Sequence, residues 1–188
     1  PRYLKVFALG YDLWSGGTNE GMDAVLNMFS DLPPTMTLDT ISRITLSAFL
    51  DSLRTHFFNT VVVHGNFQHF LLGGGYYTLN SAASQNMSEP IFLNIIDCNN
   101  GALDKPSLVK FILNNPNSGV IGIRATSRLN SPYFSATVDK AFVDLVFSGK
   151  SLGEAFYNSL ALFVPLASSD NVYRYLLYGY VLYGDPSL

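Results

Sequence analysis

The sequence predicts an α/β fold with a mostly parallel central sheet of about six strands and helices on both faces. Apolar, strand-like runs alternate along the chain with segments in which apolar residues recur at helical spacing, and this order is typical of crossover units. The 188 residues suffice for one full core, and no repeat or Pro- or Ser-rich linker divides them. We therefore expect residues 1–188 to form a single domain.

The expected strands are runs rich in β-branched, aliphatic and aromatic residues that are bounded by turn-forming residues. The three valines at 61–63 are typical of a strand that is buried on both faces of a parallel sheet. The expected strands cover residues 4–11, 35–40 as a short edge strand, 60–64, 90–98, 119–125 and 173–183.

Helices are expected between these strands. Asp104 is expected to cap the helix that follows the strand at 90–98, with Pro106 in its first turn. Ser151 and Glu154 form a capping box that opens the last helix. The expected helices cover residues 22–29, 46–53, 104–114, 138–147 and a segment that begins at 151, with glycine-rich loops at 14–21 and 73–75.

Composition excludes several classes of function. The formal net charge is −3 and the eleven Lys and Arg residues are scattered, which argues against a nucleic-acid partner. No apolar run has the length of a membrane-spanning helix, and the first residues do not form a signal peptide. The single cysteine rules out an internal disulfide. Because the sequence begins at Pro1 without a methionine, we expect a piece of a larger protein.

Two residues whose side chains can take part in catalysis follow neighbouring apolar runs. His64 comes directly after the valine run, and Cys98 ends the run at 90–98. The carboxyl ends of parallel strands form the ligand-binding edge of such sheets, so the two side chains are expected to share one cleft. A histidine can generate or stabilise a nucleophilic thiolate. The amides of Gly65 and Cys98 are the candidate donors of an oxyanion hole.

Less specific interpretations compete with this one. A lone cysteine after an apolar run is often an inert core residue, and a lone histidine at a strand end is often a structural hydrogen-bonding group. His56, His64 and His69 lack a carboxylate or thiolate at metal-binding spacing, so we expect no metal site. The glycines at 73–75 lack the Lys-Ser/Thr of a phosphate loop, and Ile96 stands where a nucleophile elbow needs glycine.

Several short motifs together resemble the gingipain family of caspase-like cysteine peptidases. A hydrophobic block ending in His-Gly is followed by a second block ending in Cys, with Asn-Gly close behind. The resemblance extends from residue 61 to residue 188, whereas the first sixty residues fit only the architecture. The similar segments are DCNNGALD at 97–104, SGVIGIRATS at 118–127, Ser131-Pro132, GKSLGE at 149–154 and YGDPSL at 183–188.

The resemblance implies a three-layer caspase-like sandwich and cysteine endopeptidase activity through a Cys-His dyad. Cys98 would attack the scissile carbonyl, His64 would protonate the leaving amine, and the Gly65 and Cys98 amides would hold the oxyanion. The implied partners are a protein or peptide substrate and other domains of the same precursor. No cofactor is required, although calcium as a structural ion is compatible with the family. The implied location is outside a bacterial cell, secreted or on the surface.

Two residues depart from the family pattern. Asp97 stands where a small residue usually precedes the cysteine, and three roles are open to it. It could point inward and raise the thiol pKa, line the S1 pocket, or cap the turn. Leu129 stands where a tryptophan usually lines the S1 pocket. These departures keep two alternatives open: a non-catalytic binding or assembly domain, and a transpeptidase that uses the same dyad.

Overall fold

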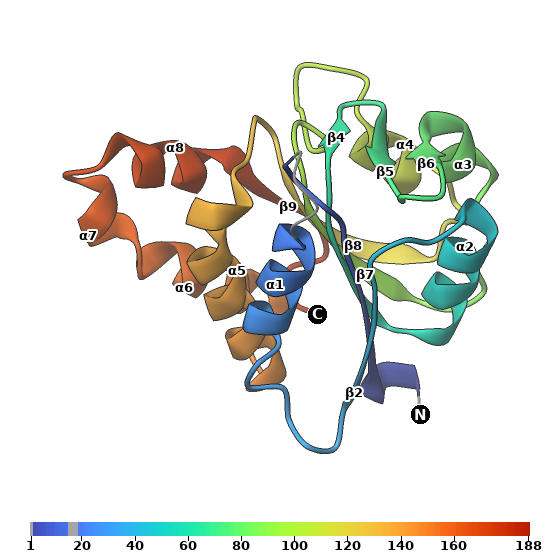
Figure 1. Ribbon diagram of the computed structural model, residues 1–188, viewed down its shortest axis with the longest axis horizontal. Helices are drawn as coiled ribbons and strands as arrows, with labels where there is room; N and C mark the ends of the chain where they lie inside the picture. Colours follow the sequence, from blue (N-terminus) through green and yellow to red (C-terminus); the bar gives the residue numbers. More distant parts are fainter. Residues whose placement is uncertain (1, 15–18) are drawn as a thin grey trace.

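A six-stranded sheet forms the centre of the structure, a computed structural model that describes residues 2–14 and 19–188 (Figure 1). The strand order is β2-β1-β3-β7-β8-β9, and only β9 runs antiparallel to its neighbour. This arrangement confirms the predicted mostly parallel sheet. The strands are β1 (Lys5–Gly10), β2 (Thr37–Ile41), β3 (Phe58–Val62), β7 (Ile91–Ile96), β8 (Val120–Thr126) and β9 (Tyr180–Gly184).

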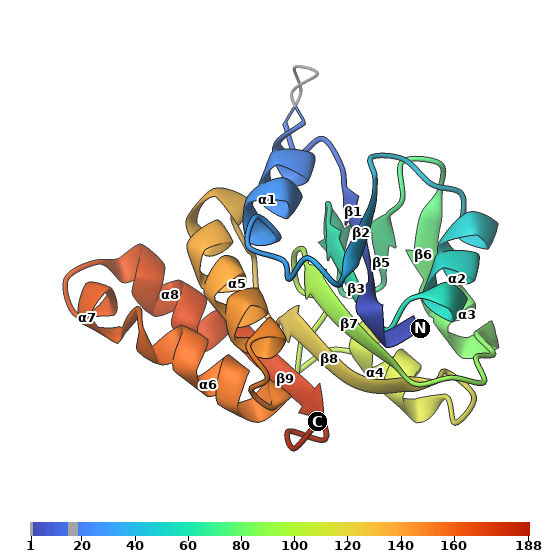
Figure 2. The same ribbon diagram turned by 90° about the horizontal axis from the view of Figure 1, so that it is seen from below.

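Helices cover both faces of the sheet, as Figures 1 and 2 show from two directions. On one face lie α1 (Glu20–Met28), α5 (Pro132–Phe147) and α6 (Leu152–Ala161). On the other face lie α2 (Leu46–Thr55), α3 (Leu79–Ser84) and α4 (Leu108–Asn114). The short α7 (Val164–Ala167) and α8 (Asn171–Gly179) continue from α6 beyond α5, and a 3₁₀ turn, Arg2–Leu4, precedes β1.

Side chains of the central strands alternate between two apolar cores, one on each face of the sheet. Val61 and Val63 enter the core beneath α2 and α4, whereas Val62 enters the core beneath α1 and α5. Ile95 and Ile96 on the neighbouring strand divide in the same way. The valine run is therefore buried on both faces, as its composition predicts, and it forms a rigid support for whatever follows it.

A second, small antiparallel sheet follows β3 and was not predicted. It consists of β4 (Gly65–Asn66), β5 (His69–Leu71) and β6 (Tyr76–Thr78). The glycines at 73–75 form the expected loop between β5 and β6, and Gly73 has a φ of 78°. His69 is the first residue of β5. Such short strands carry too few residues for a recognisable alternation.

The last predicted strand, at 173–183, is wrong over most of its length. Residues 171–179 form α8, and only the residues from Tyr180 onward form a strand. The Asp170 carboxylate accepts a hydrogen bond from the Val172 amide at 2.7 Å and so caps the helix. The aromatic residues that favour a strand here are overridden by this cap and by the packing of Leu176.

The helix boundaries are corrected at two places and confirmed at another. Asp104 does not cap α4, because the helix begins only at Leu108 and its N-cap position is Ser107. Pro106 consequently precedes the helix. The predicted helix at 138–147 begins earlier, with α5. The capping box of α6 is confirmed: Ser151 and Glu154 exchange both hydrogen bonds.

Residues 15–18 of the predicted glycine-rich loop at 14–21 lie outside the described part of the chain. Within residues 2–14 and 19–188, none of the helices combines the length and apolar character that crossing a bilayer requires.

Candidate active site

The two candidate catalytic residues follow neighbouring strands in the same register. β3 pairs in parallel with β7, Val62 opposite Ile96, and the Val63 amide donates a hydrogen bond to the Ile96 carbonyl at 3.2 Å. His64 and Cys98 each come two residues after this last pair. Both residues therefore leave the sheet at its carboxyl edge, which confirms that adjacent parallel strands carry them there.

The His64 side chain is oriented by a backbone group that follows β1. Its Nε2 lies 2.7 Å from the carbonyl oxygen of Leu13. A carbonyl oxygen only accepts hydrogen bonds, so this contact assigns the proton to Nε2 and makes Nδ1 the unprotonated ring nitrogen of the neutral imidazole. Since β1 is the other neighbour of β3, three adjacent strand ends contribute to this edge of the sheet. The ring itself is exposed to solvent.

The Cys98 thiol is half-buried and faces the loop that follows β8. Its Sγ lies 3.7 Å from the carbonyl oxygen of Asn130. Burial is the main cause that raises the pKa of the Cys98 thiol, and the adjacent Asp97 adds to the effect. The thiol is accordingly neutral at rest, and a base must take its proton before it can act as a nucleophile.

The turn that contains Cys98 is bound to the end of β8. Asn99 has a φ of 65°, in the left-handed region that asparagine tolerates better than most residues. The Asn99 amide donates to the Arg128 carbonyl at 3.1 Å, and the Gly101 amide donates to the Thr126 carbonyl at 2.9 Å. These bonds fix the backbone that follows the thiol.

Asp97 points into the protein and not into solvent. Its side chain is 2% exposed, and its Oδ2 accepts a hydrogen bond from the Asn100 side chain. The Thr126 hydroxyl donates a hydrogen bond to the backbone carbonyl of Asp97. Burial raises the pKa of the Asp97 carboxyl well above its usual range, with a partly opposing hydrogen bond from Asn100. Of the three roles considered for Asp97, these contacts agree with two: pointing inward, where it raises the thiol pKa, and capping the turn.

Gly65 is closely packed against this carboxyl. A Cβ at Gly65 would overlap Asp97 Oδ2 and would lie 2.8 Å from Asn100 Nδ2. The glycine is therefore required by a neighbour inside the protein, whatever approaches from the solvent side. This reason for the glycine has no signal in the sequence, because it depends on where a side chain thirty-two positions further along is placed.

Leu129 lies in the loop after β8 and has 65% of its surface exposed. It immediately precedes Asn130, whose carbonyl contacts Cys98. The neighbouring Arg128 forms an exposed ion pair with Asp104 at 3.0 Å. Leu129 is thus an accessible apolar side chain one residue from a contact of the thiol.

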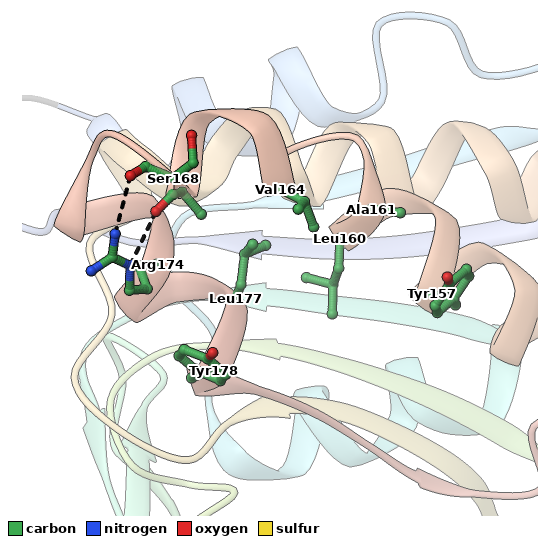
Figure 3. Close-up of a pocket in the computed structure, with 9 residues that line it drawn as sticks. Tyr157, Leu160, Ala161, Val164, Ser168, Arg174, Leu177 and Tyr178 are labelled. Atoms are coloured by element: carbon green, nitrogen blue, oxygen red, sulfur yellow. Dashed lines mark hydrogen bonds between the residues drawn. The ribbon is translucent and has the colours of Figure 1, made fainter.

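Two hollows differ in their relation to this edge. One, of about 440 Å³, is lined by Leu13, whose carbonyl contacts His64, and by the exposed Trp14. The other, of about 510 Å³, lies between α6, α7 and α8 and includes neither His64 nor Cys98 (Figure 3). Its lining is mainly apolar, and Arg174 bonds to the carbonyls of Ala167 and Ser168 at one end. The first hollow is the one that adjoins the candidate site.

The other histidines have structural contacts. His56 Nε2 lies 2.8 Å from Asp39 Oδ2, and the His69 ring packs edge-on against Tyr76. Within the described ranges, no group of three or more His, Cys, Asp or Glu side chains could hold a metal ion.

Three contributors to the site were not found from the sequence. Asn100 supports Asp97, while Leu13 and Asn130 contribute backbone carbonyls. Asn100 belongs to a turn motif that the sequence did single out. The carbonyls have no side-chain signal, since any residue type supplies one.

Comparisons with known proteins identify a family and similar folds. A family model described as peptidase family C25 matches residues 52–188. The fold is similar to that of the Arg-specific cysteine proteinase gingipain R (RgpB), with a TM-score of 0.75 and 13% identity over 99% of this chain and 47% of that one. It is also similar to the complex of the pro- and mature domains of RgpB from Porphyromonas gingivalis, with a TM-score of 0.77 and 12% identity over 99% and 48%.

A third structure, described only as a protease, has a TM-score of 0.81 and 11% identity over 100% of this chain and 48% of its own. At these identities the likeness establishes the fold alone, and the chain spans about half the length of the structures it matches. No sequence among the curated proteins matches it significantly.

Proposed function

Because the chain belongs to the gingipain family of cysteine peptidases, peptidase family C25, we propose that it hydrolyses peptide bonds with Cys98 as nucleophile and His64 as general acid. The observation that carries this proposal is the register of β3 and β7, which delivers both residues to one edge of the sheet. Thiol and imidazole supply the nucleophile and the proton transfer, so the chemistry requires no cofactor.

The first half of the reaction forms an acyl-enzyme. The neutral Cys98 thiol transfers its proton to the unprotonated Nδ1 of His64, while Nε2 remains bonded to the Leu13 carbonyl. The sulfur attacks the scissile carbonyl carbon, the C–N bond breaks, and His64 returns the proton to the leaving amine. A water molecule then attacks the thioester, which releases the carboxylic acid and restores the thiol.

The amides of Gly65 and Cys98 are the proposed oxyanion donors. Donors of this kind act when they lie about 2.7–3.1 Å from the developing oxyanion, and removing one typically costs a factor of about 10² to 10³ in turnover. Each amide belongs to a turn that is fixed by neighbouring contacts. Such fixed donors require little reorganisation during the reaction.

The substrate is proposed to be a protein or peptide whose side chains contact the surface around this edge. Leu129 is the exposed apolar side chain closest in sequence to the Cys98 contact at Asn130. The hollow lined by Leu13 and Trp14 adjoins His64. We further propose, from the family relationship, that the protein acts outside a bacterial cell as part of a longer precursor.

Labelling of the thiol tests the proposal directly. The wild type and the variants Cys98→Ala, His64→Ala and His69→Ala are incubated with an electrophilic peptide probe and, separately, with a peptide library. We expect labelling and cleavage in the wild type and in His69→Ala, which serves as the matched histidine control. Both should be lost in Cys98→Ala, and cleavage should be lost in His64→Ala. An unlabelled, inactive wild type would refute the peptidase proposal.

One observation favours a second candidate, a non-catalytic caspase-like binding domain. The buried Asp97 contributes to the raised pKa of Cys98, which opposes thiolate formation. This candidate predicts binding to a partner that survives Cys98→Ala, with no proteolysis by the wild type. A transpeptidase is distinguished by mass spectrometry, because its products carry an added amine instead of water.

A further inference from the structure

Asp97 lies between the two turns that carry the proposed catalytic groups. It follows the end of β7, and its side chain turns toward the face of the sheet that α4 covers. Its Oδ2 lies against Gly65, which comes directly after His64. The same oxygen accepts the hydrogen bond from Asn100, two residues after Cys98. One carboxyl oxygen thus contacts both turns.

The fit between Asp97 and Gly65 leaves no spare room. A single added carbon on Gly65 would overlap the carboxyl oxygen. The φ of Gly65 is not positive, so its backbone is compatible with alanine and only the space is limiting. The side chain at position 97 therefore fills the space between Gly65 and the end of β7.

Asn100 extends the contact to two further elements. Its Nδ2 lies 3.4 Å from the His69 carbonyl in β5, and its own carbonyl accepts from the Val109 amide in α4 at 3.4 Å. A second bond ties the same region together, because the Leu108 amide donates to the Phe67 carbonyl at 2.7 Å. The small sheet and α4 thus fix the position of Asn100, and Asn100 fixes that of Asp97 through its side-chain hydrogen bond.

Among the described residues Asp97 forms no ion pair, and its Oδ1 has no hydrogen-bond partner although it is buried. The groups that face the carboxyl are uncharged: the Gly65 backbone, the Asn100 amide and the Thr126 hydroxyl near its carbonyl. A buried carboxyl in such surroundings favours its neutral form. An apolar residue would fill this space without the cost of burying a carboxyl. The presence of a carboxyl therefore points to a function in holding the local geometry.

We propose that Asp97 is a positioning residue that sets the spacing between the His64-Gly65 turn and the Cys98 turn. It does not contact the substrate. It acts through Gly65 and Asn100 on the two amides that are proposed to hold the oxyanion. This inference rests on the proposed function, since the oxyanion hole belongs to it.

A double-mutant cycle between positions 65 and 97 tests the proposal. Turnover and KM are measured for a peptide taken from the library, together with the rate of Cys98 alkylation by iodoacetamide and the unfolding temperature. Gly65→Ala is expected to lower kcat by about 10²-fold, the cost of misplacing an oxyanion donor, with a smaller change in KM. Asp97→Ala is expected to lower kcat by about tenfold or more.

The double variant Gly65→Ala/Asp97→Ala removes the overlap and is expected to recover at least tenfold in kcat over Gly65→Ala alone. Asp97→Asn keeps the shape of the side chain and is expected to stay within a few-fold of the wild type. Gly179→Ala, where an added Cβ meets open space, and Asp104→Asn, an exposed carboxyl, are the matched controls. Both controls should leave kcat unchanged.

Additive effects of the two single substitutions would overturn the positioning role, as would an Asp97→Ala variant that turns over like the wild type. An Asp97→Asn variant as slow as Asp97→Ala would overturn it too. The coupling between positions 65 and 97 is also measured from the alkylation rate and from the unfolding temperature. An absence of coupling in these two measurements counts against the positioning role. A wild type that cuts no peptide counts against the peptidase function alone, because those two readouts remain.

Discussion

Two aspartates are buried on opposite faces of the same sheet, and their surroundings differ in kind. Asp139, on α5, receives a hydrogen bond from Arg124 Nη1 at 2.7 Å and another from the Tyr180 hydroxyl at 2.6 Å. The Arg124 guanidinium lies 3.9 Å from the centre of the Tyr180 ring and 4.7 Å from that of Phe142. Asp97 has no such cation and contacts an amide and a glycine instead.

Asp139 therefore stabilises the fold, whereas Asp97 lies at the edge of the sheet where the catalytic chemistry is proposed. Arg124 and Asp139 form a buried ion pair between β8 and α5, so each group has an opposite charge beside it. Asp97 follows the end of its strand and has no counter-charge within the described residues, so burial favours its neutral form. The same residue type is therefore paired with a cation in one place and buried without one in the other.

The largest effect on stability is expected from breaking the paired carboxylate. Arg124→Ala leaves Asp139 buried and unpaired, and should lower the free energy of unfolding by about 3–5 kcal/mol. Arg128→Ala is the matched control, because its pair with Asp104 is exposed and should cost less than about 1 kcal/mol. Urea unfolding of the three proteins measures both values. Equal costs would show that burial does not distinguish the two pairs.

The pH dependence of stability should expose the unpaired carboxyl. The folded-state pKa of Asp97 is raised, so its contribution to stability is complete below the ordinary carboxyl pKa and is lost as the pH rises toward the folded value. Asp97→Asn removes this loss. The stability of the variant relative to the wild type should therefore increase with pH, by at most about 1.4 kcal/mol per pH unit.

Urea unfolding of both proteins between about pH 4 and pH 8 measures this difference. Asp104→Asn, which removes an exposed carboxyl, provides the control and should show no comparable increase. A stability difference between Asp97→Asn and the wild type that is constant over this range would mean that Asp97 ionises in the folded protein as it does in the unfolded chain.

The sequence was sufficient for the parts of the molecule that depend on strand composition. The valine run is apolar throughout and the run that ends at Cys98 is mainly apolar, with Asn94 and Asp97 as its polar members. Their burial, their parallel pairing and the placement of His64 at the same edge therefore follow from pattern alone. The edge strand β2 and the capping box of α6 were recognised from local signals in the same way.

The parts that were missed depend on contacts between distant residues. Nothing in the sequence near Asp97 indicates that its carboxyl packs against Gly65, because that contact joins two strands. The bond from His64 to the Leu13 carbonyl uses a backbone atom that every residue type has. In α8 the aromatic residues favoured a strand, and the cap at Asp170 decided for a helix.

A smaller effect is expected on the reactivity of Cys98. Where Asp97 is ionised, its charge adds to the burial that raises the pKa of the Cys98 thiol. Asp97→Asn should therefore alkylate with iodoacetamide faster than the wild type at high pH. At low pH the side chain at position 97 is neutral in both proteins, and the two rates should be equal. Alkylation rates across the pH range measure this crossover. A constant rate ratio would mean that the charge of Asp97 does not affect the reactivity of the thiol.

The smallest effect is expected from two exposed apolar side chains, which extend the comparison to the surface. Leu129 precedes the residue that contacts Cys98, whereas Tyr178, 83% exposed, lines the hollow between α6 and α8. Neither Leu129→Ala nor Tyr178→Ala should change the free energy of unfolding by more than about 0.5 kcal/mol. Leu129→Ala should nevertheless raise KM for the peptide substrate about five-fold, as expected when roughly 1 kcal/mol of apolar contact is lost. Tyr178→Ala should leave KM unchanged, because the hollow that Tyr178 lines includes neither of the proposed catalytic residues. An increase in KM for Tyr178→Ala alone would move the proposed substrate contact from the loop after β8 to the α6–α8 hollow.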